Sequence, residues 1–117
     1  MSEFMLLIYG DHTKYGDLSP ADWEGIHDDY VSVTGEMEAA GVKIAGAPLF
    51  GPETAKTVAA GGVVTDGPFA DITEVLGGYY LVEVPSIDEA VAWAGKLPGV
   101  TRGIDRIEVR PVQPWMA

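Results

Sequence analysis

Hydrophobic positions follow two different spacings along the first third of the chain. Residues 4–9 are all apolar, and Gly10-Asp11 ends the run. A short continuous run of strand formers predicts a strand that is buried on both faces. Further on, apolar residues recur every three or four positions, which predicts a helix with one buried face. These residues are Trp23, Ile26, Tyr30, Val33, Met37 and Ala40.

The residues that flank this helical pattern are typical of helix ends. Ser19 is a predicted N-cap, Pro20 suits the first helical position, and Asp22 can complete a capping box with Ser19. Gly41 follows the last apolar residue of the pattern, and glycine commonly ends helices. We therefore expect a helix of about twenty residues that ends at Gly41.

Three further strands and a hairpin are predicted by short apolar runs between turn residues. Residues 42–45 form a strand candidate, and residues 54–59 and 62–65 flank Ala60-Gly61 as a small hairpin that ends at Asp66. Residues 78–84 form an aromatic strand. The last strand is residues 106–111, where Ile107, Val109 and Pro111 alternate with charged residues.

A second helix is predicted between the aromatic strand and the last strand. Ser86 and Glu89 have the spacing of a capping box. The apolar stripe of this helix consists of Ala90, Val91, Ala94 and Leu97, and Pro98-Gly99 is expected to end it.

The order of these elements predicts an α+β domain with a βαββαβ pattern and an inserted β-hairpin. A length of 117 residues fits a single domain over residues 1–117. Two helices cover only one face of the sheet, yet the strands are apolar on both faces. A bare apolar face of this size is unusual for a soluble monomer, so we predict a homodimer with its sheets face to face.

Composition excludes several kinds of site. The chain has no cysteine, which excludes disulfides, zinc-thiolate sites and cysteine nucleophiles. Eighteen acidic and seven basic residues give a net charge of −11, which disfavours binding to nucleic acid and to anionic membranes. No spacing of histidines and carboxylates predicts a metal site, and no glycine-rich loop predicts a nucleotide cofactor.

The N-terminal apolar run is short and lacks a basic segment before it, so it does not have the form of a signal peptide. No stretch approaches the ~18 apolar residues of a transmembrane helix. We therefore expect a soluble, cytoplasmic protein.

The turn Asp66-Gly67-Pro68-Phe69 is the strongest candidate site. Asp66 ends the predicted hairpin, so its carboxylate is a candidate general acid or base, or a polar anchor for a small molecule in a neighbouring cavity. The alternative is that Asp66 caps its own turn, which is common for aspartate before glycine.

His27, Tyr9, Tyr79 and Tyr80 are the other candidates. His27 follows Trp23 by four positions, which places it at the edge of the buried helix face, within reach of the sheet. The alternative is a boundary histidine bonded to a neighbour such as Asp28. The three tyrosines lie on predicted central strands, where each hydroxyl either enters a cavity or is satisfied within the core.

A central motif and the two ends of the chain together resemble a known family. The motif is Asp66-Gly67-Pro68-Phe69-Ala70-Asp71 with Glu74 and Leu76-Gly77-Gly78-Tyr79-Tyr80, and the ends are residues 5–10 and 107–112. This pattern resembles the DGPF-type proteins of the YCII-related family. The chain departs from the family at Thr73, where a basic residue is common.

The resemblance implies a ferredoxin-like fold, with an antiparallel sheet and two helices on one face, that pairs as a dimeric α+β barrel. It also implies a suspected enzymatic role for a His and Asp pair, and an association with sigma factors of the extracytoplasmic-function type.

Three functional hypotheses follow. The chain is an enzyme that transfers protons with Asp66 and His27 in a pocket lined by Tyr9, Gly67, Pro68, Phe69, Tyr79 and Tyr80. Alternatively, it binds a small molecule in that pocket without chemistry, or it is an accessory or regulatory partner of a sigma factor. Fold-level analogy does not choose between them, so enzyme status stays open.

Overall fold

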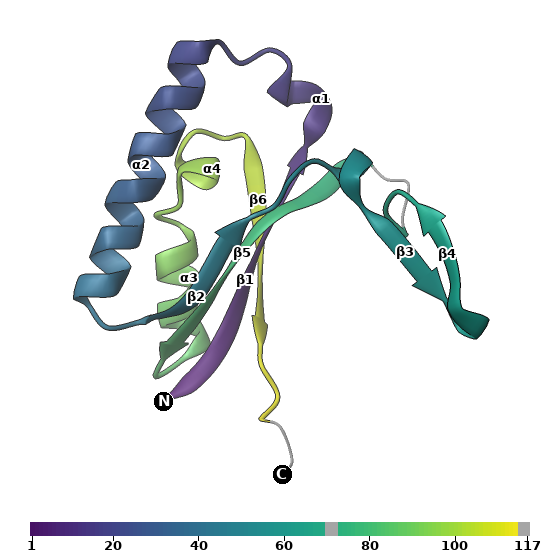
Figure 1. Cartoon of the computed structure of the whole chain (residues 1–117). Coiled ribbons are helices and arrows are strands. Elements are labelled where there is room, and N and C mark those ends of the chain that lie inside the picture. The colour runs from purple at the N-terminus through teal and green to yellow at the C-terminus, as the bar shows by residue number, and fades with distance from the viewer. Residues whose placement is uncertain (70–72, 115–117) are drawn as a thin grey trace.

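A computed structural model describes residues 1–69 and 73–114 of the chain. A four-stranded antiparallel sheet carries helices on one face, and a separate two-stranded hairpin projects from the other side (Figure 1). The predicted βαββαβ pattern with an inserted hairpin is confirmed. Asp71 of the motif lies outside the described residues.

The four-stranded sheet has the ferredoxin-like strand order β2-β5-β1-β6. Its central strands are β1 (Ser2–Asp11) and β5 (Glu74–Val84), and its edges are β2 (Lys43–Pro48) and β6 (Asp105–Pro111). In the β1–β5 register, Leu6 faces Tyr80 and Leu7 faces Tyr79, so the two tyrosines lie on opposite faces of the sheet.

The helices are α1 (His12–Tyr15), α2 (Pro20–Ala39), α3 (Ile87–Ala94) and α4 (Pro98–Thr101). Of these helices, α2, α3 and α4 lie on the same face of the sheet (Figure 1). Pro98 was expected to end a helix, but it begins α4, because proline suits the first helical position. No helix among the described residues is long and apolar enough to cross a membrane.

The predicted start of α2 is confirmed in detail. Ser19 Oγ accepts a hydrogen bond from Asp22 N at 3.1 Å, and Asp22 Oδ2 accepts one from Ser19 N at 2.8 Å. The hydrogen bond that the Ser19 backbone donates to the carboxylate is the main cause that holds the pKa of Asp22 below its usual value. Beyond the end of α2, Gly41 adopts a φ of 71°, in the left-handed region that glycine favours.

The hydrophobic core lies between the helices and one face of the sheet. It contains Phe4, Leu6, Ile8, Met37, Tyr80, Val82, Val84, Ala90, Ala94 and Leu97. Residues 4–9 were expected to be buried on both faces, and this is wrong for the single chain. Met5, Leu7 and Tyr9 are only half-buried, because none of the described helices covers their face of the sheet.

The predicted hairpin is also confirmed. It consists of β3 (Lys56–Ala59) and β4 (Val63–Asp66), and we call it the hairpin arm. The arm extends on the side of the sheet that the helices leave open (Figure 1). It exposes the apolar side chains of Val58, Val63 and Val64.

Candidate functional site

Asp66 lies at the end of the hairpin arm, where its carboxylate is exposed. Its Oδ1 accepts a hydrogen bond from Lys56 Nζ at 2.6 Å, and 87% of its side chain is accessible. The turn after it is held by other groups, since Gly67 N donates to the Ala55 carbonyl at 2.7 Å and Thr57 Oγ1 donates to the Gly67 carbonyl at 2.8 Å. Asp66 therefore pairs with Lys56 and does not cap its own turn.

The rest of the predicted pocket at this turn is exposed as well. Pro68 is exposed, and 91% of Phe69 is accessible. Within the described part of a single chain, the turn does not form an enclosed cavity.

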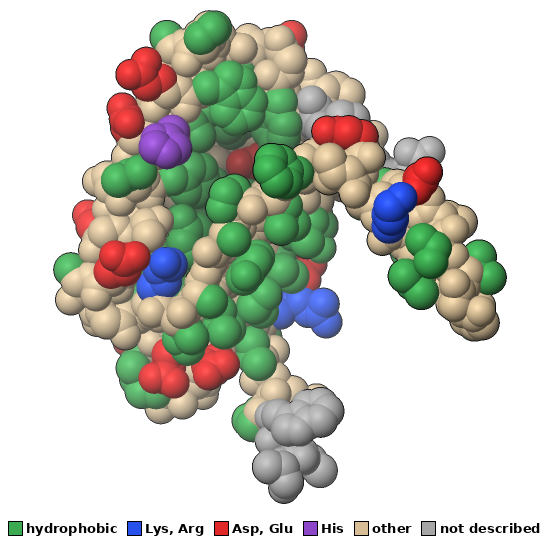
Figure 2. Space-filling model, viewed as in Figure 1, with side chains coloured by type: hydrophobic (Ala, Val, Ile, Leu, Met, Phe, Trp, Pro, Cys, Tyr) green, Lys and Arg blue, Asp and Glu red, His purple; other side chains and the backbone are tan. Residues whose placement is uncertain are grey.

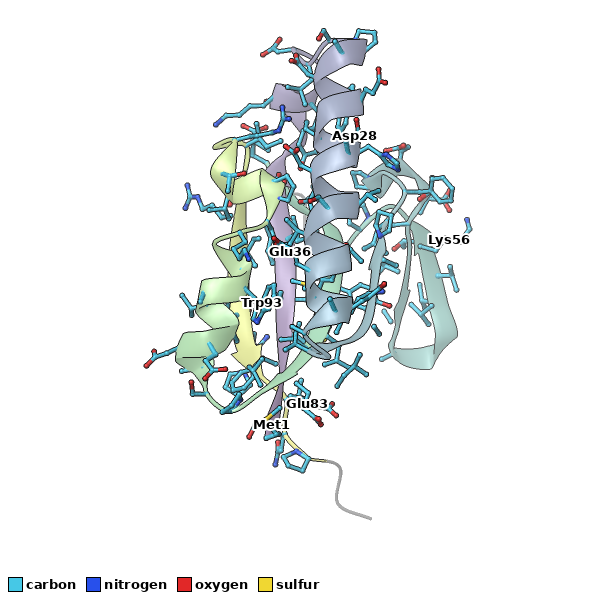
Figure 3. The ribbon with its side chains drawn as sticks, turned by 90° about the vertical axis from the view of Figure 1, so that its left-hand side faces the viewer. Met1, Asp28, Glu36, Lys56, Glu83 and Trp93 are labelled. Carbon is cyan, nitrogen blue, oxygen red and sulfur yellow. The ribbon has the colours of Figure 1, made fainter. Side chains whose placement is uncertain are left out.

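His27 lies on the solvent side of α2, which corrects the prediction that it reaches the sheet. Its side chain is 77% accessible, and Nδ1 is 3.8 Å from Asp28 Oδ1. The reason is helix geometry: the preceding Ile26 is buried, and one residue further turns about 100° around the axis. Figure 3 places Asp28 on α2 and Lys56 on the arm, on opposite sides of the sheet, so a single chain does not pair His27 with Asp66.

The three predicted pocket tyrosines are divided between the two faces of the sheet. Tyr9 and Tyr79 lie half-buried on the open face. Tyr80 is buried on the helix face, where its hydroxyl forms a 2.8 Å hydrogen bond with Thr34 Oγ1 of α2. One cavity of a single chain therefore cannot be lined by all three.

The open face carries a shallow hollow at the edge formed by β6. Its volume is about 340 Å³, and it is lined by Tyr9, Glu74, Arg106, Ile107 and Glu108. Arg106 Nη2 lies 3.3 Å from Glu74 Oε1, so the charges at this hollow are paired.

A polar cluster that the sequence analysis did not single out lies on the helix face. Tyr15 Oη donates a 2.6 Å hydrogen bond to Asp105 Oδ1. Tyr15 is held in place because Asp11 caps α1, accepting a hydrogen bond from Thr13 N at 2.9 Å. The Tyr15 ring also packs edge-on against Trp23, with ring centroids 5.7 Å apart.

Two glycines leave the space that Asp105 occupies. Gly10 of β1 is the register partner of Asp105, and a Cβ there would overlap Tyr15 Oη and Asp105 Oδ1. A Cβ at Gly99 of α4 would overlap Asp105 Oδ2. The carboxylate thus fits between β1 and α4 only because neither position has a side chain.

Burial and hydrogen bonding affect the ionisation of the cluster in opposite ways. Burial raises the pKa of Asp105, and the hydrogen bond from Tyr15 partly opposes this rise. Burial and the neighbouring Asp105 carboxylate raise the pKa of Tyr15 above its usual value. Burial, with the same carboxylate nearby, raises the pKa of Tyr30 to about 12. Both tyrosines are therefore neutral at neutral pH, and Tyr15 donates its hydroxyl proton to Asp105.

The second oxygen of Asp105 is available to a ligand. Oδ2 has no hydrogen-bond partner among the described residues. No side-chain oxygen or nitrogen in the described part of the chain is both sealed from solvent and unpartnered. Oδ2 therefore reaches solvent. Figure 2 shows a hollow between α2 and the sheet, lined by hydrophobic side chains and with acidic atoms inside it.

One signal in the sequence pointed to Asp105. Asp105 continues the alternation of Ile107 and Val109, which are half-buried on the helix face. The strand was predicted to begin at residue 106, and a start at residue 105 would have placed Asp105 on the same face. Tyr15 had no comparable signal. Among the side chains that the structure describes, no three of His, Asp or Glu lie close enough together to hold a metal ion.

Comparison with known proteins identifies the family. The model of the YCII-related domain matches residues 3–116. The chain belongs to the YCII-related family. It is also 31% identical over 113 residues to the uncharacterized protein R00369 of Rhizobium meliloti (strain 1021), an alignment that covers 93% of this chain and 90% of that protein.

Among solved structures, the YCII-family chain is similar to 5-chloro-2-hydroxyhydroquinone dehydrochlorinase (TftG) from Burkholderia phenoliruptrix AC1100, in complex with 2,5-dihydroxybenzoquinone. The two share 18% identity with a TM-score of 0.47, and the match covers 96% of this chain and 93% of that chain. A similarity of this degree carries no argument about activity.

Proposed function

We propose that this YCII-family protein binds a small molecule in the hollow between α2 and the sheet, with Asp105 at the polar end of the site. The observation that supports the proposal is the position of Asp105, which is half-buried with one oxygen engaged by Tyr15 and the other reaching solvent. Burying a carboxylate without full hydrogen bonding costs free energy, and such groups concentrate at functional sites.

The surroundings of Asp105 have the chemistry of a ligand site. Such sites are mostly apolar and aromatic, with a few polar groups that orient the ligand. Trp23 and Tyr15 supply aromatic surface, and the hydroxyls of Tyr30 and Tyr80 lie on the same side of the sheet. This proposal moves the site away from the Asp66 turn, where Asp66 and Phe69 are exposed.

We also propose that the protein is a homodimer that pairs through the open face of the sheet. Met5, Leu7, Tyr9, Tyr79 and Leu81 place apolar surface on that face. The hairpin arm extends on the same side, and the radius of gyration of 15.6 Å exceeds the value of about 13 Å for a compact domain of this length. A second copy would cover both the face and the arm.

In such a dimer, the arm of one copy would approach the other copy. The predicted cavity beside Asp66, Gly67, Pro68 and Phe69 would then form between two chains. Acid–base roles for Asp66 and His27 stay predictions for that assembly. The cytoplasmic location and the association with a sigma factor also stay predictions. A pull-down with the tagged full-length chain tests the second of these.

The binding site can be tested by NMR. A library of small aromatic molecules is added to the ¹⁵N-labelled protein, and amide shifts are mapped onto the structure. We expect binders whose shifts concentrate at Gly10, Tyr15, Tyr30, Gly99 and Asp105. A screen without binders, or shifts confined to the open face or the arm, would contradict the proposal.

A further inference from the structure

We infer that the ligand of the Asp105 site is a small organic cation, whose protonated amine contacts Asp105 Oδ2. This inference rests on the proposed function and adds the chemical class of the ligand. The charges around Asp105, the aromatic side chains beside it and the net charge of the whole chain support it.

Asp105 has no positively charged partner among the described residues. It takes part in none of their ion pairs, and its one hydrogen bond comes from the neutral hydroxyl of Tyr15. Arg102, which directly follows α4, is engaged by Asp29, whose Oδ2 accepts from Arg102 Nε at 3.0 Å and from Nη2 at 2.8 Å. A half-buried carboxylate is normally paired, so the missing cation is the group that a ligand can supply.

The other groups that interact with Asp105 suit a cation and not an anion. Tyr30 lies close enough to Asp105 to interact with it electrostatically, and Tyr15 contacts it directly. Aromatic rings attract ammonium groups through their electron-rich faces, most strongly where water is excluded. Asp11 lies near enough to Tyr15 to add negative potential to this end of the sheet.

The net charge of the whole molecule also favours a cationic ligand. Eighteen acidic and seven basic residues make the net charge −11, which attracts cations to the surface and repels anions. A half-buried carboxylate accepts hydrogen bonds but cannot donate one, so an anionic ligand at Asp105 would meet repulsion and find no hydrogen-bond donor in the carboxylate.

Three probes of nearly the same shape separate the possible ligand classes: benzylamine, benzyl alcohol and benzoate. Each is titrated at pH 7 into the full-length protein, with amide shifts at Gly10, Gly99 and Asp105 as the readout. We expect benzylamine to bind at least tenfold more tightly than benzyl alcohol, and benzoate not to bind. We expect Asp105→Asn to remove the advantage of benzylamine.

Asp88→Asn is the matched control, because Asp88 is an exposed carboxylate in the first turn of α3 and its removal changes the net charge equally. We expect it to leave benzylamine binding within twofold of the parent. Equal loss of binding in both variants would show a general charge effect and would overturn the inference.

The outcomes also separate this inference from the proposed function. If benzyl alcohol or benzoate binds at the same amides as tightly as benzylamine, the hollow is a binding site but the ligand is not a cation. If no probe shifts these amides and the library screen also finds no binder there, both the inference and the proposed function fail.

Discussion

The hydroxyl of Tyr15 donates a 2.6 Å hydrogen bond to a carboxylate 90 positions away in the sequence, that of Asp105. The bond joins α1, which directly follows the first strand, to the start of the last strand. It therefore connects the two ends of the fold on the helix face of the sheet, and it orients the carboxylate on which the proposed site depends.

Tyr15→Phe tests this bond. We expect the free energy of unfolding at pH 7 to fall by about 1–3 kcal/mol, because a partly buried carboxylate loses its hydrogen-bond donor. The bond opposes the rise in the pKa of Asp105, so the loss should be smaller at a pH low enough to protonate the carboxyl. Urea denaturation at pH 7 and pH 3 measures both values. An equal loss at the two pH values would indicate lost packing only.

Asp105→Asn tests whether the carboxylate is held at a cost in stability. Because burial raises its pKa in the folded state, protonation stabilises the fold, and that contribution is lost as pH rises from the unfolded value through the raised folded value. We therefore expect the asparagine variant to have a higher melting temperature than the parent at pH 7.

The difference should disappear at pH 3, where the parent carboxyl is protonated, and calorimetry at the two pH values measures it. A lower melting temperature for Asp105→Asn at pH 7 would mean that the carboxylate stabilises the fold. The protein would then not be giving up folding stability to keep a carboxylate at this position.

Gly10→Ala tests the space left for the cluster. An added Cβ would overlap Tyr15 Oη and Asp105 Oδ1, so we expect a loss of about 1–3 kcal/mol, typical of overpacking. Gly35→Ala is the matched control in the exposed middle of α2, where a Cβ meets nothing within 4 Å. That change should stabilise the protein by about 0.5–1 kcal/mol through helix propensity. Equal effects of both changes in urea denaturation would contradict the tight packing at Gly10.

Leu81→Glu tests the proposed dimer. Leu81 pairs with Met5 at the centre of the open face, and a charge there would be buried by a second copy. We expect the parent to sediment as a dimer at micromolar concentration and Leu81→Glu as a monomer.

Val91→Glu is the control for this experiment, because Val91 is 52% exposed on α3, which lies on the helix face of the sheet. It should leave the dimer intact. A monomeric parent, or a Leu81→Glu variant that stays dimeric, would show that the open face is not the interface.

Most of the fold could be predicted from local patterns in the sequence. The cap at Ser19 and the alternation after Arg106 involve residues within a few positions of one another, and the structure confirms both. The helical spacing is confirmed at Ile26 and Met37, which are buried, whereas Trp23 and Ala40, near the two ends of α2, are exposed. Such signals act over one helical turn or one pleat, so they predict an element without knowledge of the elements that pack against it.

The candidate site could not be predicted in the same way. The Asp66 turn has a specific local motif, but its exposure depends on the hairpin arm leaving the sheet. His27 directly follows the buried Ile26, and the rotation of about 100° per residue along the helix places its side chain in solvent.

Local pattern alone thus determined the order of the elements, their caps and the two-faced apolar sheet. The tertiary structure decided which carboxylate is partly withdrawn from water. Asp105 meets Tyr15, Gly10 and Gly99 only when β6 pairs with β1 and α4 packs against the end of the sheet. These contacts join residues far apart in the chain, and no periodicity along the sequence encodes them.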